Sequence, residues 1–383
     1  MKFNQWTLGL AAVGAVSLAS AVRADEAKLS PLQTALSNTT ISGYVDVAAQ
    51  YNLGNQLNRG YYDYIDKRDA FTLNNVTISL DKPQDETPWA AGYHVDLNAG
   101  KDAINGYQPN EQSWYTQSNG LLSIRQAYLA LRTPVGNGID WKIGVMDGIT
   151  GYEGNTGYAN PNITRSLGYA INPASFTGIL GTYKVSSLIA VTGGFINRTD
   201  SQGYGQNNYN LSSHDYVASV SLTAPDSWGF LKGSALNIQT VQGFDNQAVN
   251  NYSVNGTLNT PVAGLTLGFA WDSLQSLVSS VDGNIYGLYA TYQATDKLSL
   301  ALRGEYLDST DLVTDVPNTY PSYGSIRQKG EEITGTVTYN LWANVVTRAE
   351  VRWDHQEHGT TFESASSSTE NQFSFIVNAV YKF

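Results

Sequence analysis

Charged side chains recur at every second position in two segments of the C-terminal part of the chain. Arg303 and Glu305 are two residues apart, and Arg348, Glu350 and Arg352 continue the same spacing. In an extended strand alternate residues point to one face, so each set places opposite charges side by side. Such a row can close into salt bridges, or it can orient ions and polar solutes that pass beside it.

Histidines are the other candidates for acid–base or metal chemistry, because the chain has four of them and no cysteine. His94 lies two residues from Asp96, and His355 and His358 could be read as a metal pair. That pair falls in a predicted loop, where no helix aims both rings at one ion. A G-x-S-x-G elbow is absent, and the Gly-rich stretches lack a βαβ context. We therefore expect no enzyme, no metal site and no cofactor.

Composition excludes several other classes of protein. Hydrophobic residues make up 42% of the chain and charged residues only 14%, about half of the share that soluble proteins carry. The formal net charge of -11 argues against nucleic-acid binding, which needs a basic face. No run of about 18 apolar residues exists, so helical membrane spans are excluded. The 36 glycines and 25 tyrosines instead favour a β-structure between lipid and water.

The N-terminus has the three parts of a bacterial secretory signal. Lys2 precedes an apolar stretch, residues 8–22, and small residues offer two cleavage positions, after Ala21 or after Ala24. We expect a signal peptide over residues 1–24, a short periplasmic segment over 25–39 and one barrel domain over 40–383. This arrangement predicts export to the outer membrane of a Gram-negative-type cell envelope.

Apolar and polar residues alternate in short segments from residue 40 to the end, which is the pattern of half-buried strands. Sixteen segments show it: 40–51, 70–81, 88–98, 121–132, 139–147, 176–185, 188–197, 213–224, 230–240, 251–258, 264–272, 284–293, 297–308, 331–340, 343–354 and 370–383. Each has about the length that a tilted strand needs to cross a bilayer. The predicted fold class is all-β, a transmembrane antiparallel up-and-down β-barrel of about 16 strands.

The connections between these segments alternate between long and short. Outer-membrane barrels have long outer loops and short periplasmic turns, whereas a soluble sandwich has no reason to sort its loops in this way. Aromatic residues such as Trp89 and Trp342 stand near segment ends, where amphipathic rings suit the lipid headgroups. The terminal Phe383 resembles the C-terminal signature by which outer-membrane proteins are recognised for insertion.

A set of short motifs lies in the stretch from Gln126 to Gly178. They are Gln126-Ala127-Tyr128, Pro134-Val135-Gly136, Gly144-Val145, Gly151-Tyr152-Glu153, Asn160-Pro161-Asn162-Ile163-Thr164-Arg165-Ser166, Pro173 and Thr177-Gly178. In these motifs, and in the early Gly43-Tyr44-Val45-Asp46, the chain resembles the OmpL-like β-barrel porins. The resemblance implies a pore in the outer membrane.

Several charged residues should line such a pore. A charge on the lipid face near mid-bilayer costs about 2–4 kcal/mol, so charged strand residues should point inward or sit at a rim. The predicted pore-lining residues are Arg132, Lys142, Arg303, Glu305, Arg348, Glu350 and Arg352. The alternative is that these charges form internal salt bridges that fill the lumen.

The longest connection, roughly residues 148–175, is the third long loop and contains Glu153 and Arg165. In general porins the third outer loop folds inward and narrows the channel. We hypothesise the same here, with Glu153 facing the three arginines of the two charged segments. The alternative is a loop that stays outside, over solvent or a neighbouring subunit.

The sequence thus predicts an outer-membrane porin, a passive diffusion channel for ions and small polar solutes. Its partners would be outer-membrane lipid and those solutes, with a homotrimer as a possible assembly and no nucleic acid. The alternative is a structural or adhesive barrel with a closed lumen, whose outer loops bind a ligand.

Overall fold

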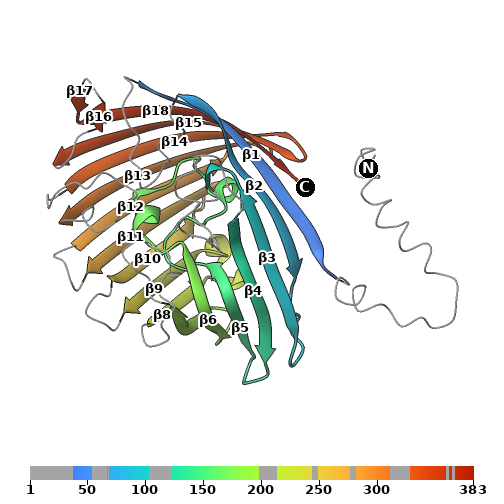
Figure 1. Ribbon diagram of the computed structural model, residues 1–383. Helices are drawn as coiled ribbons and strands as arrows, with labels where there is room; N and C mark the ends of the chain where they lie inside the picture. The colour runs from blue at the N-terminus through green and yellow to red at the C-terminus, as the bar shows by residue number, and fades with distance from the viewer. Residues whose placement is uncertain are drawn as a thin grey trace, which may run out of the picture. The chain divides into compact units, whose positions relative to one another are not determined.

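The computed structural model describes residues 38–53, 67, 69–102, 123–197, 214–243, 249–276, 282–310, 328–358, 362–364 and 367–383. The predicted signal peptide lies outside the described residues, as does almost all of the predicted periplasmic segment. In the described part of the chain, sixteen antiparallel strands close into one barrel (Figure 1). The predicted fold class is therefore confirmed. Among the same residues, no helix is long and apolar enough to cross a membrane.

Each strand of the barrel pairs with its neighbour in the chain, and the last strand closes on the first. The strands are β1 (Thr40–Asn52), β2 (Ala70–Lys82), β3 (Ala91–Ala99), β4 (Ser123–Thr133), β5 (Ile139–Asp147), β6 (Ser175–Lys184), β7 (Ile189–Asn197), β8 (His214–Thr223), β9 (Ala235–Gly243), β10 (Val249–Asn259), β11 (Leu265–Ser276), β12 (Asp282–Gln293), β13 (Leu298–Thr310), β14 (Gln328–Trp342), β15 (Val345–His358) and β18 (Asn371–Lys382). In the closing pair, Ala48 of β1 stands opposite Asn378 of β18.

Alternation along a strand determines which side chains face outward. In β18 the exposed residues Phe373, Phe375 and Val377 alternate with the buried residues Ser374 and Asn378. Exposed apolar side chains on one face and buried polar side chains on the other are what a barrel in lipid requires. The apolar surface thus lies outside, and the polar residues gather inside.

The connections follow the predicted alternation with exceptions around β8 to β12. The outer connections 244–248 and 277–281 are short, because the strands beside them run further than predicted. On the opposite side of the barrel, the turn 224–234 is long, because residues 226–231 form η5 (Asp226–Leu231), two short 3₁₀ pieces joined by a kink at Trp228 and Gly229. The ninth strand therefore begins at Ala235 and not at residue 230, as the sequence pattern suggested.

Two further strands lie in the last long connection. β16 (Phe362–Ser364) and β17 (Ser367–Thr369) pair with each other in a separate two-stranded sheet. The sequence pattern predicted only a loop there.

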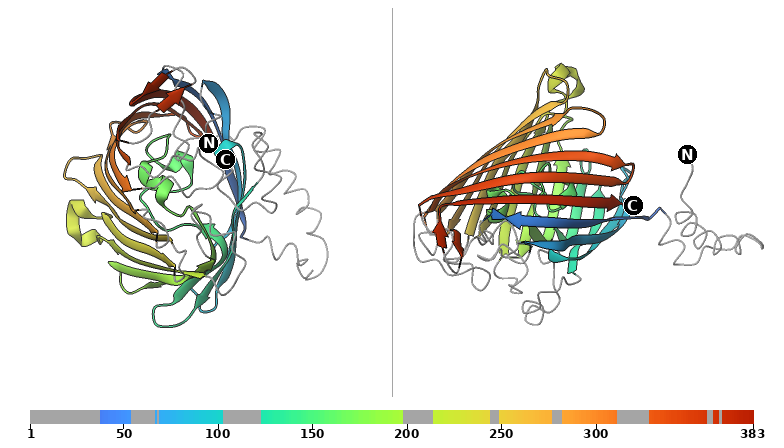
Figure 2. Two further views of the ribbon diagram at one scale, coloured as in Figure 1. Left: turned by 60° about the vertical axis from the view of Figure 1, so that its left-hand side comes forward. Right: turned by 90° about the horizontal axis from the view of Figure 1, so that it is seen from above.

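The third long connection, residues 148–174, is here named loop L3. It contains a short 3₁₀ helix, η4 (Gly157–Ala159), and one helical turn, α4 (Leu167–Ile171). Ser166 caps α4 by accepting a hydrogen bond from the Tyr169 N–H at 2.9 Å. In the left view of Figure 2 the green ribbon of L3 lies inside the ring of strands.

Candidate functional site

Loop L3 packs against the inner wall through apolar contacts at two places. At its root, Ile149 packs on a buried cluster from β5 to β9: Met146, Phe176, Leu180, Ile196, Val217 and Val241. Further along, Leu167 and Ile171 of α4 pack on Ile285 and Leu307 of β12 and β13. Burying these side chains removes apolar surface from water, which favours the docked position of the loop.

Arg303 of β13 connects the loop to the wall by ion pairs. Its Nη1 donates to Glu153 Oε1 at 2.7 Å and to the Thr164 carbonyl oxygen at 2.9 Å. Its Nε donates to Glu332 Oε1 of β14 at 2.6 Å. All three charged side chains are buried. Arg303 therefore joins one carboxylate of the loop to carboxylates of the wall, with Glu305 as a third partner at 3.7 Å.

The other two arginines of the predicted row bind the loop backbone. Arg352 donates from Nη1 to the Arg165 carbonyl oxygen at 2.6 Å and contacts Asp354 through Nε and Nη2, each at 2.9 Å. Arg348 donates from Nη1 to the carbonyl oxygens of Gly157 and Asn160, both at 3.2 Å. We had expected Glu153 to face all three arginines. Among the described ion pairs, Glu153 pairs with Arg303.

The carboxylates of the same rows bind N–H groups of the loop. Glu350 accepts hydrogen bonds from the Ile163 N–H and, at 2.9 Å, from the Thr164 N–H. Glu305 accepts from the Leu167 N–H and, at 3.1 Å, from the Gly168 N–H, the first free donors of α4. Arginines on carbonyl groups and carboxylates on N–H groups together anchor the backbone of L3 along β13 and β15.

Close approach at Gly168 adds a steric requirement. A Cβ atom there would lie 2.4 Å from Oδ2 of Asp272 on β11, closer than real Cβ atoms come to any neighbour. A larger residue would fit here only if the buried Asp272 side chain or α4 itself shifted.

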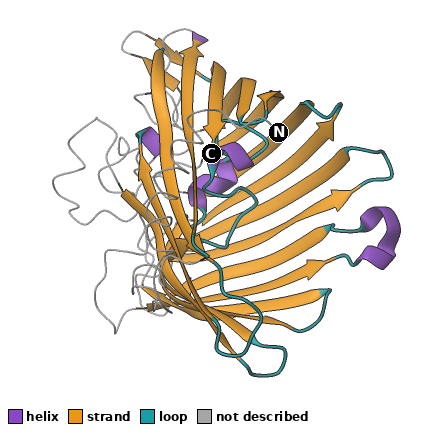
Figure 3. Ribbon diagram, turned by 90° about the vertical axis from the view of Figure 1, so that its right-hand side faces the viewer, coloured by secondary structure: helices purple, strands orange, loops and turns teal. Residues whose placement is uncertain are grey.

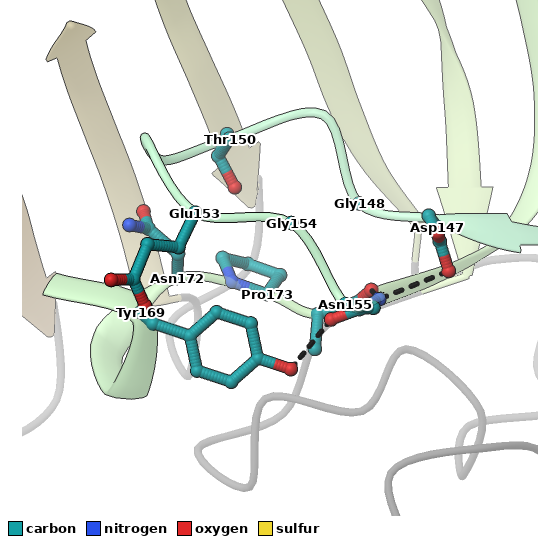
Figure 4. A pocket seen from close by; sticks show the side chains of 10 residues that line it. Asp147, Gly148, Thr150, Glu153, Gly154, Asn155, Tyr169, Asn172 and Pro173 are labelled. Atoms are coloured by element: carbon teal, nitrogen blue, oxygen red, sulfur yellow. Dashed lines mark hydrogen bonds between the residues drawn. The ribbon is translucent and has the colours of Figure 1, made fainter. Parts of the chain in front are cut away.

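Arg165 closes the loop on itself through hydrogen bonds to backbone carbonyl groups. Its guanidinium donates to the carbonyl oxygens of Gly154 and Asn155 at 2.7 and 2.6 Å and stands over the Tyr169 ring at 4.7 Å. Asn155 in turn donates to Asp147 at 3.0 Å and accepts from the Tyr169 hydroxyl at 2.6 Å (Figure 4). These contacts border a small pocket of about 60 Å³ between the two arms of L3.

Tyr152 stacks on Tyr289 of β12 with ring centroids 4.0 Å apart. Burial, with a smaller contribution from the charge of Glu153, raises the pKa of Tyr152 to about 12. The ring therefore stays neutral at physiological pH and serves as an apolar contact of the loop.

Two predicted residues lie apart from the loop. Lys142 is exposed and stands over the Tyr128 ring at 4.8 Å. Arg132 donates to Asp140 at 2.6 Å, beside the short turn 134–138. The structure thus brings together Glu153, Arg165, Arg303, Glu305, Arg348, Glu350 and Arg352, and it leaves Arg132 and Lys142 elsewhere on the barrel.

The sequence had placed the row of opposite charges against water, whereas the structure places it beneath L3. Arg303, Glu305, Arg348, Glu350 and Arg352 are all buried. Whether any of them controls the passage of ions stays a prediction.

Sequence reasoning missed Glu332, which pairs with Arg303 in the wall, and Arg125, which binds the loop itself. Glu332 alternates with Thr334 and Thr336 on one face of β14, so the period of two carried the signal. Arg125 was hidden by a change of register. Gln126 pairs with Asp96 and Ile124 with Leu97, so Arg125 is the extra residue of a bulge. It donates to Thr156 of L3 at 3.0 Å and pairs with Asp147.

Two of the histidines contact neighbouring acid or amide side chains in the described part of the chain. His94 lies between Asp81 and Asp96, at 2.8 and 3.1 Å. His355 lies in β15 and not in a loop, and its ring contacts Asn371 at 3.1 Å. No group of three or more His, Asp and Glu side chains is placed to hold a metal ion among the described residues.

Solved structures of outer-membrane proteins share this fold. The channel DcaP of Acinetobacter baumannii superposes with a TM-score of 0.60 at 13% identity, over 90% of this chain and 97% of that one. The anion-selective porin of Comamonas acidovorans gives 0.58 at 10% identity, over 90% and 99%. OmpT of Vibrio cholerae gives 0.54 at 13%, over 90% and 97%. No curated protein matches the chain.

A family model described as "Putative beta-barrel porin-2, OmpL-like" matches residues 38–383, which include the whole barrel and L3. The match agrees with the resemblance carried by the motifs between Gln126 and Gly178. Family and fold point to an outer-membrane channel and not to an enzyme. The chain belongs to the OmpL-like β-barrel porin-2 family.

Proposed function

We propose that the protein is a passive diffusion channel for ions and small polar solutes, driven by their concentration gradients and independent of a cofactor. The supporting observation is the position of L3, which lies inside the barrel and is bonded to the wall by Arg303, Arg348 and Glu350. A loop held in this way narrows the lumen without needing a partner to keep it there.

In this proposal the buried charges beneath L3 fix the constriction, and the exposed cation Lys142 acts on ions directly. A charge in contact with water in the lumen attracts or repels ions, whereas a buried and compensated pair has little outward field. Arg165 helps to keep the shape of the loop, because its guanidinium binds two carbonyl oxygens of the loop backbone.

The proposal includes export and assembly. Residues 1–24 would be removed as a signal peptide, and the mature chain would reside in the bacterial outer membrane. A homotrimer is the proposed assembly, because one structural neighbour, OmpT of Vibrio cholerae, is described in a trimer form.

Recording from single molecules in a planar lipid bilayer tests the channel. We expect stepwise increases in current when purified protein inserts, with an open-state conductance that scales with salt concentration. Bilayers that contain the folded protein but carry no current would contradict the proposal and favour a closed structural or adhesive barrel. Sucrose-gradient separation of membranes, followed by N-terminal sequencing, tests the location and the cleavage after Ala24.

A further inference from the structure

The turn 224–234 presents two exposed aromatic side chains on a folded element. Trp228 is 51% exposed and Phe230 is 56% exposed, and both belong to η5. Figure 3 shows η5 beyond the ends of the strands, on the side of the barrel where the short turns lie. We refer to residues 224–234 as the aromatic turn.

The aromatic turn is ordered by its own hydrogen bonds. At its neck the Ala224 N–H donates to the Ser234 carbonyl oxygen at 2.8 Å, and the Gly233 N–H donates to the Ala224 carbonyl oxygen at 2.9 Å. Gly229 adopts a positive φ of 61°, which reverses the chain between the two aromatic residues. Because the backbone is fixed, the exposure of the rings is a built-in property and not the result of a loose loop.

The surface around the aromatic turn indicates what covers it. The strands that lead into it expose Val220 and Ile238 on the outer face of the barrel, which faces lipid. The apolar outer face of these two strands therefore leads toward the turn. Other short turns at this end also expose an apolar side chain: Trp89, Val135, Val262 and Trp342. These residues indicate the level of the membrane boundary.

The aromatic turn carries one pair of opposite charges. Lys232 Nζ donates to Asp226 Oδ2 at 2.9 Å, so the two charges compensate each other. What remains is an apolar, electrically balanced projection with one indole N–H, which suits the boundary between headgroups and acyl chains.

We propose that the aromatic turn inserts Trp228 and Phe230 into the lipid leaflet on the short-turn side and anchors the barrel there. This inference rests on the membrane location that forms part of the proposed function. It does not depend on whether the barrel conducts ions.

Quenching of fluorescence by brominated phospholipids tests the proposal. The protein is reconstituted in phosphatidylcholine vesicles, and the signal of Trp228 is taken as the difference between wild type and Trp228→Phe. A control introduces Leu288→Trp into the Trp228→Phe protein. Leu288 lies in the middle of β12 and is 72% exposed on the outer face.

We expect bromine near the glycerol end of the acyl chain to remove more than half of the Trp228 signal, and bromine near the methyl end to remove much less. The Leu288→Trp control should show the opposite preference. If the control is quenched by lipid while Trp228 responds only to aqueous iodide, the proposal is overturned and the membrane barrel stands. If neither is quenched, the membrane location fails as well. A third outcome is that Trp228 is shielded from iodide only while the protein is concentrated in the vesicles, and becomes accessible when more lipid is added. The turn would then contact a second copy of the protein, and the proposal would be overturned.

Discussion

The guanidinium of Arg303 lies 2.7 Å from the carboxylate of Glu153, a residue that precedes it by 150 positions, and both side chains are almost completely buried, at 0% and 1% exposed. The pair joins the wall of the barrel to the loop inside it. Because Arg303 also pairs with Glu332, removing the arginine and removing the loop carboxylate are unequal perturbations.

Substituting Arg303 should therefore disturb the loop more than substituting Glu153. Arg303→Met removes the described cation of the buried Glu153 and leaves Glu332 with Arg352 alone, at 3.7 Å; breaking a buried pair by removing one partner costs about 3–5 kcal/mol. Glu153→Gln leaves Arg303 paired with Glu332 and should cost less. We expect the unfolding temperature to be lowest for Arg303→Met, intermediate for Glu153→Gln and highest for wild type. Single-channel currents should be largest and noisiest for Arg303→Met and smallest for wild type.

A matched control is Arg132→Met, which removes a partly exposed pair with Asp140 at the edge of the barrel. Such pairs contribute about 0–1 kcal/mol, so neither stability nor conductance should change much. If Arg303→Met and Arg132→Met had the same unfolding temperature and the same single-channel conductance, the buried pair would not position the loop.

Gly168→Ala should displace α4 from the wall. The added methyl group would collide with the carboxylate of Asp272, and overpacking of this kind costs about 1–3 kcal/mol. Gly154 of the same loop has open space where its Cβ would lie, so Gly154→Ala is the control. Limited proteolysis of L3 and single-channel conductance should change in Gly168→Ala alone. A Gly168→Ala protein with wild-type cleavage and current would show that the Asp272 side chain moves aside without displacing α4, contrary to the prediction.

The period of two in the sequence was sufficient to predict the barrel, because lipid on one side and polar groups on the other constrain every second residue. It also placed Arg303, Glu305, Arg348 and Glu350 on the inner face. The boundaries around β8 and β9 could not be obtained in this way, since η5 forms through local hydrogen bonds that alternation does not encode.

The partners inside the barrel were harder to predict than the faces. Glu350 binds N–H groups more than 180 positions away in the sequence, and no local pattern identifies such a contact. The bulge at Arg125 shifts the parity of its strand, so a simple count of alternate residues overlooks it. Alternation specifies the side of the sheet, but only packing in three dimensions specifies the partner.

Glu350→Ala should release the segment around Ile163 and Thr164. Their buried N–H groups would lose their acceptor, which costs about 1–3 kcal/mol for each group left unpaired. Glu350→Gln keeps one acceptor oxygen, so it should release the segment less than Glu350→Ala does. Because the chain has no native cysteine, a Thr164→Cys label can report the release by electron paramagnetic resonance.

The Glu350 experiment has its control on the neighbouring strand. Glu331 of β14 is adjacent to the buried Glu332 and lies on the alternate face, so Glu331→Ala should leave the label immobile. The label itself removes the Thr164 hydroxyl, so every spectrum is compared with the labelled parent. Identical spectra for Glu350→Ala and the parent would mean that other contacts suffice to hold the loop.

Ion preference should respond to Lys142 and not to a similar lysine outside the lumen. Lys142 stands exposed over the Tyr128 ring on the inner wall, whereas Lys297 stands exposed over Tyr339 at a short turn, with centroid distances of 4.8 and 6.0 Å. Lys142→Glu replaces a positive charge in contact with lumen water by a negative one, so passing anions are repelled and cations are attracted.

We expect the reversal potential in a potassium chloride gradient to shift toward cation preference for Lys142→Glu and to stay unchanged for Lys297→Glu. The shift should shrink at high salt, because counterions screen an exposed charge within a few ångströms. Equal reversal potentials for the two variants would remove Lys142 from the ion pathway and place that pathway elsewhere in the barrel.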